Sequence, residues 1–552
     1  MMLRRALLLC VALSFAGSTS HRSFGAAPPA PAPAAREAAW RENNLGVALL
    51  EQFRFTDAAG AFQRALAKDP SLLPARINLA IAHLYVPDIA AAKQAAEEAL
   101  RAAPDAPQPN YILALIARSE GRAEEALPYI RKVLEKDPKD LGANVTLGQV
   151  YLQMRQFDEA AAAFRVAVAA EPYNVSGAYN LGVALTRAGK REEGQEAMAR
   201  FQKLRDSAYK SALGSNYLEQ GRYAEALPST GAEPESVDTK TPAVSFLGSD
   251  EAAVGASTIV LSDLDGDGAL DAVTAGSGGL RVLRNEKSRF ADVTQKAGLA
   301  GVAALLAAAG DYDNDGLPDL LASGPSGLSL FHNEGAGRFK AEAGIPAFAH
   351  PAATAAFVDI DHDGDLDALV AAAARGGPGL LLRNNGDRTF ADLTAAAKLE
   401  VAGGALAIIP TDFDNRRDVD LFLLRAEGPA LLKNMRDGTF QDVASEVGLV
   451  ATGPFRSAAA GDVNKDGYTD FFLGGMGPSS LALSDGRGAF SVTPAPGPAA
   501  GALAAQFTDY DNDGLLDLLV VAAEGPRLLR NLGTSWADVS ATAFPKAPKT
   551  RP

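Results

Sequence analysis

Cysteine is almost absent from this chain of 552 residues, in which Cys10 is the only one. The chain beyond Cys10 therefore has no disulfides and no thiol chemistry, and any extracytoplasmic β-structure in it needs another stabilising device. Histidine is also scarce, and its five residues are scattered: His21, His83, His332, His350 and His362. With no serine nucleophile motif either, the sequence predicts a protein that is not an enzyme.

Basic residues are outnumbered, since 52 Lys and Arg face 67 Asp and Glu and leave a net charge of −15. Nucleic acid is not an expected partner, because phosphate binding requires clustered Lys and Arg. Apolar runs of membrane-spanning length are missing after the first residues, so no integral membrane span is expected once those are removed. The chain is too long for one hydrophobic core, which predicts two or more domains.

The first residues have the layout of a secretory signal. Arg4 and Arg5 precede an apolar run at 6–16, and small polar residues follow at 17–20. We assign residues 1–25 to a bacterial-type signal peptide, which predicts export to the periplasm or secretion; an uncleaved anchor is the alternative. A lipoprotein signal is disfavoured because no small residue precedes Cys10. The Ala/Pro tract at 26–36 is expected to be an extended tether.

A period of 34 residues runs from Trp40 to about Leu227. In each unit a leucine precedes a small residue, a second small residue comes twelve positions later, and a proline closes each of the first four units. These positions are Leu45-Gly46, Leu79-Ala80, Leu113-Ala114, Leu147-Gly148 and Leu181-Gly182; Ala58, Ala92, Ala126, Ala160 and Gly194; and Pro70, Pro104, Pro138 and Pro172. Small residues let antiparallel helices approach and proline ends the second one, so each unit is predicted to be a helix–turn–helix.

This pattern resembles the tetratricopeptide repeat, which implies an α-solenoid whose concave groove binds peptides or partner domains. We place the array at 37–227, with a sixth, atypical unit suggested by Leu213-Gly214, Tyr217 and 221–226. The first helix of each pair should line the groove and receive a protein partner, through Asn43, Val47, Tyr111, Gln149, Gln153 and Tyr179. Three asparagines that share one repeat position are predicted to be structural: Asn44, Asn78 and Asn180.

A polar linker is expected at 228–242, and a second repeat domain at 243–545 before a tail at 546–552. Five segments of this domain follow the pattern D-x-[DN]-x-D-G-x-x-D. Positions 1, 3, 5, 7 and 9 are Asp263, Asp265, Asp267, Ala269 and Asp271 in the first loop; Asp311, Asp313, Asp315, Leu317 and Asp319 in the second; Asp359, Asp361, Asp363, Asp365 and Asp367 in the third; Asp462, Asn464, Asp466, Tyr468 and Asp470 in the fifth; and Asp509, Asp511, Asp513, Leu515 and Asp517 in the sixth.

The spacing indicates calcium. Side chains at positions 1, 3 and 5 of a tight loop converge, glycine at position 6 permits the bend, and the carbonyl at position 7 and the carboxylate at position 9 complete a shell of about six to eight oxygens. We predict about five Ca²⁺ sites. An EF-hand is excluded because it needs glutamate at position 12, where Thr274, Ala322, Val370, Leu473 and Val520 stand. The flanks are strand-like, so the loops are placed in β-hairpins.

The fourth segment departs from this plan. It keeps Asp412, Asp414, Asp418 and Asp420 but has Arg416 at position 5, and Arg417 replaces the glycine. A guanidinium can neutralise carboxylates without a metal. We therefore predict a degenerate loop in which an internal salt bridge takes the place of calcium.

Five of the six units also carry a downstream signature that predicts two more strands. An apolar residue, a basic residue and an asparagine recur and an aromatic residue follows them: 283–285, 331–333, 382–384, 432–434 and 529–531, then Phe290, Phe339, Phe390, Phe440 and Trp536. About 48 residues thus give a four-stranded propeller blade. His332 stands at the basic position and is taken as structural. Six blades are expected, with residues 243–247 as a strand that closes the ring. Seven blades are the alternative.

The second domain resembles the FG-GAP/VCBS repeat propellers, the class that includes integrin α-subunit heads. Tails such as 290–294 are similar to those of the ASPIC/UnbV group. The resemblance implies calcium-stabilised, extracytoplasmic recognition. We therefore expect an exported scaffold or adhesion-type protein, with a protein in the helical groove and a protein or glycan at the propeller. An assembly factor for envelope complexes is the alternative, and a propeller hydrolase or lyase acting on polysaccharide is a weaker one.

Overall fold

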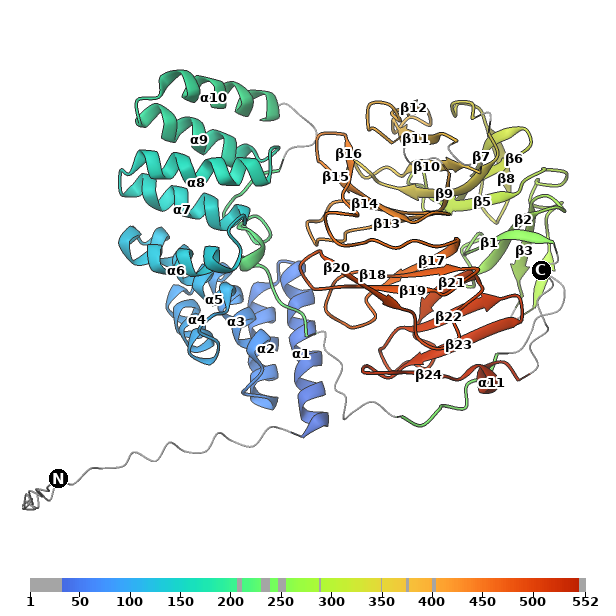
Figure 1. Ribbon diagram of the computed structural model, residues 1–552, viewed down its shortest axis with the longest axis horizontal. Coiled ribbons are helices and arrows are strands. Elements are labelled where there is room, and N and C mark those ends of the chain that lie inside the picture. Colours follow the sequence, from blue (N-terminus) through green and yellow to red (C-terminus); the bar gives the residue numbers. More distant parts are fainter. Residues whose placement is uncertain are drawn as a thin grey trace, which may run out of the picture.

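The computed structural model describes residues 32–205, 211–229, 239–246, 255–286, 289–348, 350–373, 377–399 and 404–545. The predicted signal at 1–25, the tether up to residue 31 and the tail at 546–552 lie outside the described residues. An array of helices and a β-propeller lie side by side (Figure 1). Within the described ranges, no helix combines the length and the apolar character needed to cross a membrane.

Ten helices form the array as five antiparallel pairs. They are α1 (Pro33–Glu51), α2 (Phe55–Lys68), α3 (Leu73–Tyr85), α4 (Ile89–Ala102), α5 (Pro107–Ser119), α6 (Ala123–Lys136), α7 (Leu141–Gln153), α8 (Phe157–Ala170), α9 (Val175–Arg187) and α10 (Arg191–Arg205). The predicted tether end at 36 is wrong, because α1 already begins at Pro33. Proline suits the first turn of a helix, and the alanines that follow it favour helix.

The small residues of the repeat make room for large ones, as predicted. A Cβ on Gly46 would lie 2.4 Å from the ring of Phe62, and one on Gly148 would lie 2.5 Å from the ring of Phe164. Both rings are fully buried. The second helix of each of the first four pairs ends two residues before the closing proline, which cannot donate the next backbone hydrogen bond.

The predicted sixth repeat is wrong. Residues 211–229 contain one short 3₁₀ turn, η1 (Arg222–Ala224), and no α-helix. Gly221 has φ of +97°, outside the helical region, and main-chain groups of the segment bond to side chains of the array instead of to carbonyls one turn back. The segment therefore packs on the array and does not extend it.

Six four-stranded antiparallel sheets form the propeller. Their strands are β1 (Ala256–Ser262), β2 (Asp271–Gly276), β3 (Arg281–Asn285) and β4 (Phe290–Asp292); β5 (Leu306–Gly310), β6 (Asp319–Gly324), β7 (Gly327–Asn333) and β8 (Phe339–Glu342); β9 (Ala352–Val358), β10 (Asp367–Ala372), β11 (Gly379–Asn384) and β12 (Phe390–Asp392); β13 (Ala405–Thr411), β14 (Asp420–Arg425), β15 (Pro429–Asn434) and β16 (Phe440–Asp442); β17 (Phe455–Gly461), β18 (Asp470–Gly475), β19 (Ser480–Ser484) and β20 (Phe490–Pro494); and β21 (Ala502–Thr508), β22 (Asp517–Ala522), β23 (Gly525–Asn531) and β24 (Trp536–Asp538).

Side chains on the second strand of each blade point alternately toward the two neighbouring blades, and their packing builds the propeller core. On β14, Leu421 and Leu423 pack toward the third blade, whereas Phe422 and Leu424 pack toward the fifth. Clusters of this kind join every consecutive pair from the first blade to the sixth. Among the described residues no such cluster joins the sixth blade to the first.

The predicted closing strand at 243–247 is not a strand within the described part, which ends at Phe246. Phe246 instead donates its amide to Ala543 O (2.7 Å) and stacks on Phe544, with 5.3 Å between the ring centroids. Ala543 belongs to α11 (Ser540–Ala543), which follows the last strand. The segment thus docks on the sixth blade beside this short helix.

Candidate metal centres

The aspartate loops connect the first two strands of each blade, as the sequence predicts. Position 9 begins the second strand and pairs with the last residue of the first, as Gly310 does with Asp319. The loop backbone enters the left-handed region at the glycine of position 6, for example Gly316 with φ of +88°. Glycine adopts this conformation without a steric cost, which explains its place in the pattern.

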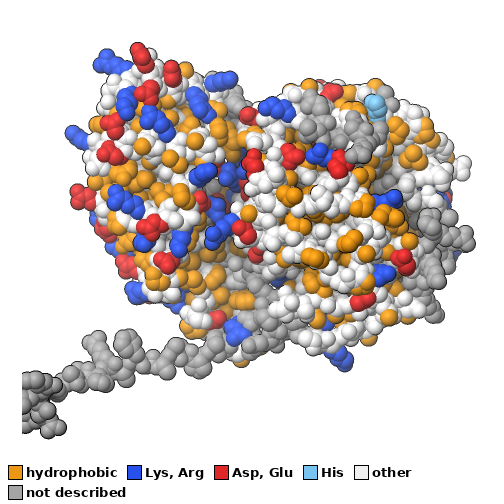
Figure 2. Space-filling model, in the orientation of Figure 1, with side chains coloured by type: hydrophobic (Ala, Val, Ile, Leu, Met, Phe, Trp, Pro, Cys, Tyr) orange, Lys and Arg blue, Asp and Glu red, His pale blue; other side chains and the backbone are white. Residues whose placement is uncertain are grey.

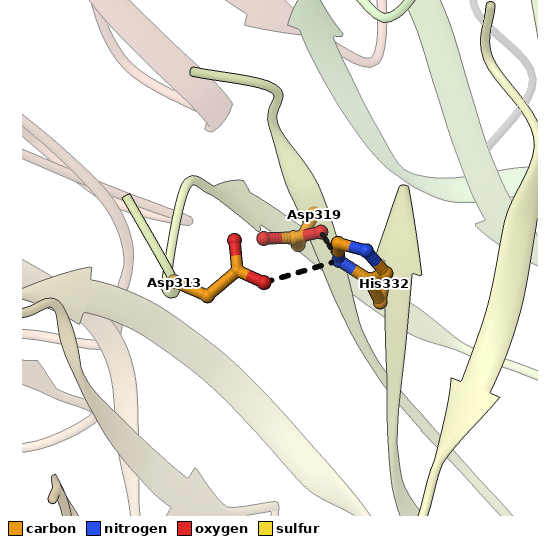
Figure 3. A group of neighbouring side chains, drawn as sticks. All are labelled: Asp313, Asp319 and His332. Carbon is orange, nitrogen blue, oxygen red and sulfur yellow. Dashed lines mark hydrogen bonds and ion pairs between the residues drawn. The ribbon is translucent and has the colours of Figure 1, made fainter. Parts of the chain in front are cut away.

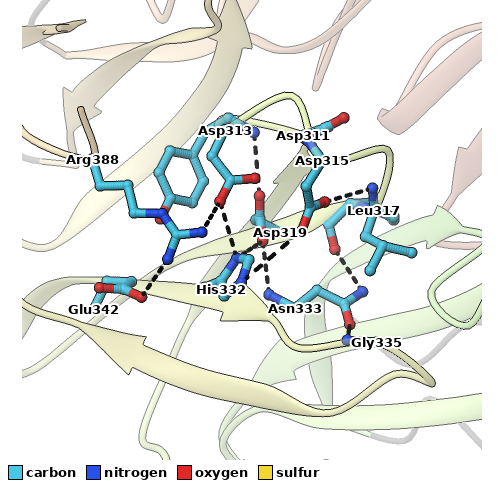
Figure 4. A network of polar contacts seen from close by, with 12 residues as sticks. Asp311, Asp313, Asp315, Leu317, Asp319, His332, Asn333, Gly335, Glu342 and Arg388 are labelled. Atoms are coloured by element: carbon cyan, nitrogen blue, oxygen red, sulfur yellow. Dashed lines mark hydrogen bonds and ion pairs between the residues drawn. The ribbon is translucent and has the colours of Figure 1, made fainter. Parts of the chain in front are cut away.

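The carboxylate at position 1 organises the loop backbone. In the second loop Asp311 accepts the amides of Asp315 (3.1 Å) and Gly316 (2.8 Å). Asp315 at position 5 accepts the amide of Leu317 at position 7 (2.9 Å) (Figure 4). The first, third, fifth and sixth loops repeat these bonds. The loops therefore have a preformed shape with their side chains gathered inside.

The carboxylate at position 9 is the most deeply buried of the group. Asp319 accepts the amides of Tyr312 (3.2 Å) and Asn333 (2.7 Å) and has no solvent exposure. Burial raises the pKa of Asp319 to about 6, against the lowering effect of these two hydrogen bonds. Burial likewise raises the pKa of Asp367 and of Asp517 to about 7. These carboxylates are held close to other negative charges in a dry site.

The position-3 carboxylates have an oxygen for which the described residues provide no hydrogen-bond donor. Their Oδ1 atoms are buried and accept no hydrogen bond in Asp265, Asp313, Asp361, Asp414 and Asp511. The side chain of Asp313 is 9% exposed and that of Asp511 is 3% exposed. A buried carboxylate oxygen without a donor is unfavourable. A cation inside the loop would satisfy it, so the donor set fits a metal.

The loop carboxylates also converge as cation ligands must. Ligand atoms lie within 4.8 Å of one another at positions 1, 3 and 9 of the first, third and fourth loops and at positions 1, 3 and 5 of the second. All of these donors are oxygens, which suits Ca²⁺. The carbonyl at position 7 stays a predicted ligand.

A basic side chain inside the loops is a feature that sequence reasoning missed. Arg284 Nε lies 2.9 Å from Asp265 Oδ2, and Arg530 Nε lies 2.7 Å from Asp511 Oδ2. In the second loop His332 Nδ1 lies 3.3 Å from Asp313 Oδ2 and 3.2 Å from Asp319 (Figure 3). In the first, second and sixth blades the residue before the recurring asparagine therefore pairs with the position-3 carboxylate of its own blade.

The signal for this pairing was present in the sequence. Only the fifth of the six loops has a neutral residue, Asn464, at position 3. Its blade is also the one in which an apolar residue, Leu483, stands where the other blades have Arg, Lys or His. The two positions change together because a lone buried cation without its carboxylate would be unfavourable.

The recurring asparagine links neighbouring blades, which the sequence did not indicate. Asn333 donates through Nδ2 to Leu264 O of the preceding blade (2.9 Å) and to Pro318 O of its own (3.1 Å). The same bond to the preceding blade recurs at 3.2 Å or less for Asn384, Asn434 and Asn531. Each of these side chains ties one loop to the loop before it.

The fourth loop contains the predicted internal ion pairs. Arg416 Nε lies 3.2 Å from Asp414 Oδ2, which also pairs with Lys433, and Arg436 pairs with Asp418. Arg417 takes the left-handed conformation of the glycine it replaces, with φ of +63°. The loop keeps the shape of a metal loop but fills it with cationic side chains of its own.

The fourth loop also faces the helical array. Lys and Arg side chains gather where the array and the propeller meet (Figure 2). Arg436 lies over the ring of Tyr173, with 5.5 Å between Cζ and the ring centroid. Arg417 Nη2 lies 3.3 Å from Glu225 and 3.9 Å from Glu51. The degenerate loop is therefore a contact between the two domains.

Comparisons with known families agree with this architecture. The FG-GAP-like repeat model matches residues 263–322, 311–370, 412–473 and 462–520. Two tetratricopeptide repeat models match residues 117–172 and 77–140. None of the curated proteins is similar enough to match this chain.

Some solved structures are similar to part of this chain. MamA from Desulfovibrio magneticus RS-1 is 19% identical over 31% of this chain and 97% of its own, with a TM-score of 0.29. YrrB, described as a tetratricopeptide protein with an unusual peptide-binding site, is 23% identical over 30% of this chain and 84% of its own, with a TM-score of 0.27. An Agrocybe aegerita lectin specific for terminal N-acetylglucosamine is 19% identical over 52% of this chain and 79% of its own, with a TM-score of 0.39. The chain is a tetratricopeptide array joined to a six-bladed propeller of FG-GAP-like repeats.

Proposed function

We propose that this protein is an exported, calcium-stabilised scaffold that brings binding partners together and has no catalytic role. The observation that carries the proposal is in the helical groove. Two asparagines of successive repeats bind the main chain of residues 227 and 229 there. A groove that bonds main-chain groups can hold a polypeptide segment of varied sequence.

Calcium is the proposed stabiliser of the propeller. The buried, unsatisfied Oδ1 atoms at position 3 and the converging carboxylates support it. About five loops are proposed to bind Ca²⁺, and the fourth to remain metal-free because Arg416 replaces the position-5 carboxylate and both Arg416 and Lys433 pair with Asp414. Extracellular modules typically bind calcium with Kd of about 10⁻⁴–10⁻³ M. Because the loops lie within the blade hairpins, the ions act as structural supports.

Export is proposed from the first residues, where a basic start precedes a short apolar run. The single cysteine fits a protein in which metal ions, instead of disulfides, stabilise the β-structure. The partner at the propeller is proposed to be a protein or a glycan, bound by loops other than the metal loops. Such loops are the commonest place for binding residues on a rigid scaffold.

Two measurements test the proposal. Calcium titration of the chelated protein, followed by calorimetry, is expected to show about five bound ions, and a protein that binds none would contradict the calcium role. For the scaffold role, a photo-crosslinking amino acid replaces the exposed Tyr179 on the array or the exposed Val450 on the propeller. Protein or glycan adducts are expected in the native compartment. If neither position gives any adduct, the scaffold role is wrong.

A further inference from the structure

Residues 211–229 lie across the groove of the helical array. The first helix of every repeat contacts them, that is α1, α3, α5, α7 and α9. The segment begins at the fifth repeat, ends at the first and passes between the array and the propeller (Figure 1). From α9 to α1 the contacts are Ser176 with Leu213, Gly142 with Gly221, Tyr111 with Gln220, Asn78 with Leu227 and Asn44 with Ser229. Between its ends the segment turns back, because Gly214 donates to Glu219 O and Tyr217 packs on Tyr85 of the second repeat before residues 220–223 contact the third and fourth repeats. The groove predicted to receive a partner is therefore occupied by the chain itself.

Asparagine side chains bind this segment through its main chain. Asn78 donates to Leu227 O (2.7 Å) and accepts the amide of Leu227 (2.7 Å). Asn44 makes the same pair of bonds with Ser229, at 3.0 and 2.7 Å. Asn44 and Asn78 occupy the same position of successive repeats, and they bind alternate residues of the segment, as the pairing of an extended strand would. Any extended segment offers the same main-chain groups.

Two tyrosines provide the side-chain contacts that a chosen sequence must match. Tyr217 is 1% exposed and packs edge-on against Phe55 and Tyr85, at centroid distances of 6.2 and 5.3 Å. Tyr223 packs edge-on against Tyr111 at 6.2 Å. Buried aromatic side chains of this kind carry most of the binding energy in peptide recognition. The groove thus has two aromatic sites at a fixed separation.

The propeller holds the segment from the other side. Arg417 of the degenerate fourth loop pairs with Glu225 in the segment and with Glu51 at the end of α1. Glu51 in turn accepts the hydroxyl of Tyr217 (3.0 Å). These charged side chains are part-exposed, so the contact is weak and easily broken. The contact exists because Arg417 occupies the loop position at which the other five loops have glycine.

We propose that residues 211–229 are an intramolecular ligand of the helical groove, which a partner segment that presents two aromatic residues to the same two sites displaces. This deepens the proposed function and rests on it, since the partner of the array would be such a segment. The main-chain bonds accept any extended chain, whereas the two tyrosine sites select for aromatic side chains. The contact with Arg417 keeps the groove closed while the propeller is docked.

A synthetic, fluorescently labelled peptide of residues 211–229 tests this on the full chain by fluorescence anisotropy. In the wild type the tethered segment competes at an effective concentration near the millimolar range, so the peptide should bind weakly. Tyr217→Ala with Tyr223→Ala weakens the tethered copy and leaves the groove intact, so affinity for the peptide should rise at least about tenfold. Adding Asn44→Ala and Asn78→Ala to that variant should abolish the gain.

Circular dichroism must show native helical content in each variant. If the double tyrosine variant does not fold, Arg417→Ala replaces it, since that exposed side chain has no core contact; a smaller gain of about threefold is then expected. A peptide with alanine at both tyrosine positions is the control and should not bind. A folded, segment-weakened chain that fails to bind the wild-type peptide would overturn the proposal. Peptide binding without any crosslinked partner in the native compartment would instead contradict the scaffold role and leave the intramolecular ligand standing.

Discussion

Single residues set the charge of each aspartate loop. In the sixth loop Arg530 bridges Asp511 (2.7 Å) and Asp513 (3.0 Å) while only 3% of its side chain is exposed. A guanidinium in this place neutralises two of the expected calcium ligands, and it repels a divalent cation. In the fifth loop Leu483 brings no charge, and Asn464 is a neutral oxygen ligand. The loops are therefore unequal, although their aspartate patterns look alike.

The sixth loop should gain calcium affinity when Arg530 is replaced with leucine. Removing the internal cation leaves both carboxylates free to bind the metal. We expect the calcium affinity of this loop to increase about tenfold, which corresponds to ~1.4 kcal/mol of binding free energy. The matched control is Leu483→Arg in the fifth loop, which should lower affinity there. Isothermal titration calorimetry of the chelated proteins measures both. If neither substitution changes calcium binding, the basic side chains do not compete with the metal.

Helix ends and loops could be predicted from the sequence wherever a few neighbouring residues determine them. The helices end where proline requires it, and all six loops lie in the expected hairpins, because backbone sterics act over a few residues. Residues 211–229 were mistaken for a sixth repeat because Tyr217 and 221–226 resemble its spacing. Their conformation depends on Asn44, Asn78 and Tyr111, which are more than a hundred residues away in sequence. Contacts at that separation leave no local pattern to read.

Removing calcium should melt the propeller and spare the helical array. Under the proposed function the ions bind only the folded loops, so each would contribute RT ln(1 + [L]/Kd) to stability, and chelation would remove that contribution. The helices contain none of the loop carboxylates. Differential scanning calorimetry with and without excess chelator should show the propeller transition moving to lower temperature and the array transition unmoved. A propeller transition that chelator leaves unchanged would contradict calcium as its support.

The stabilising effect of calcium on the propeller should increase with pH. Burial raises the pKa of Asp367 and Asp517 from 3.8 to about 7, so the folded, metal-free loops hold protons more tightly than the unfolded chain. That contribution is fully present below about pH 4 and is lost as pH rises through 7, which destabilises the metal-free propeller. In the proposed calcium-loaded state the metal replaces these protons. The difference in propeller melting temperature between loaded and chelated protein should be larger at pH 8 than at pH 5, and an equal difference would rule out this linkage.

At the scale of the molecule, polar contacts of limited strength join two domains. Arg417, Glu51 and Glu225 are each part-exposed, and exposed ion pairs contribute about 0–1 kcal/mol. Arg436 adds a cation–π contact with Tyr173. Burial raises the pKa of Glu171 beside them, and the neighbouring Arg416 and Arg436 oppose the shift. Interfaces of this kind permit domain motion, so the docked arrangement can open without unfolding either part.

Salt should therefore separate the domains. The Debye length falls from about 10 Å at 0.1 M to about 3 Å at 1 M salt, which weakens the exposed pairs of Arg417. We expect the radius of gyration from small-angle X-ray scattering to increase at 1 M salt, and Arg417→Ala with Arg436→Ala to produce the same increase at 0.1 M. Arg527→Ala is the control, because its exposed pair with Glu524 lies in the sixth blade. A radius that neither salt nor the double substitution changes would mean that the segment in the groove, and not the fourth loop, holds the domains together.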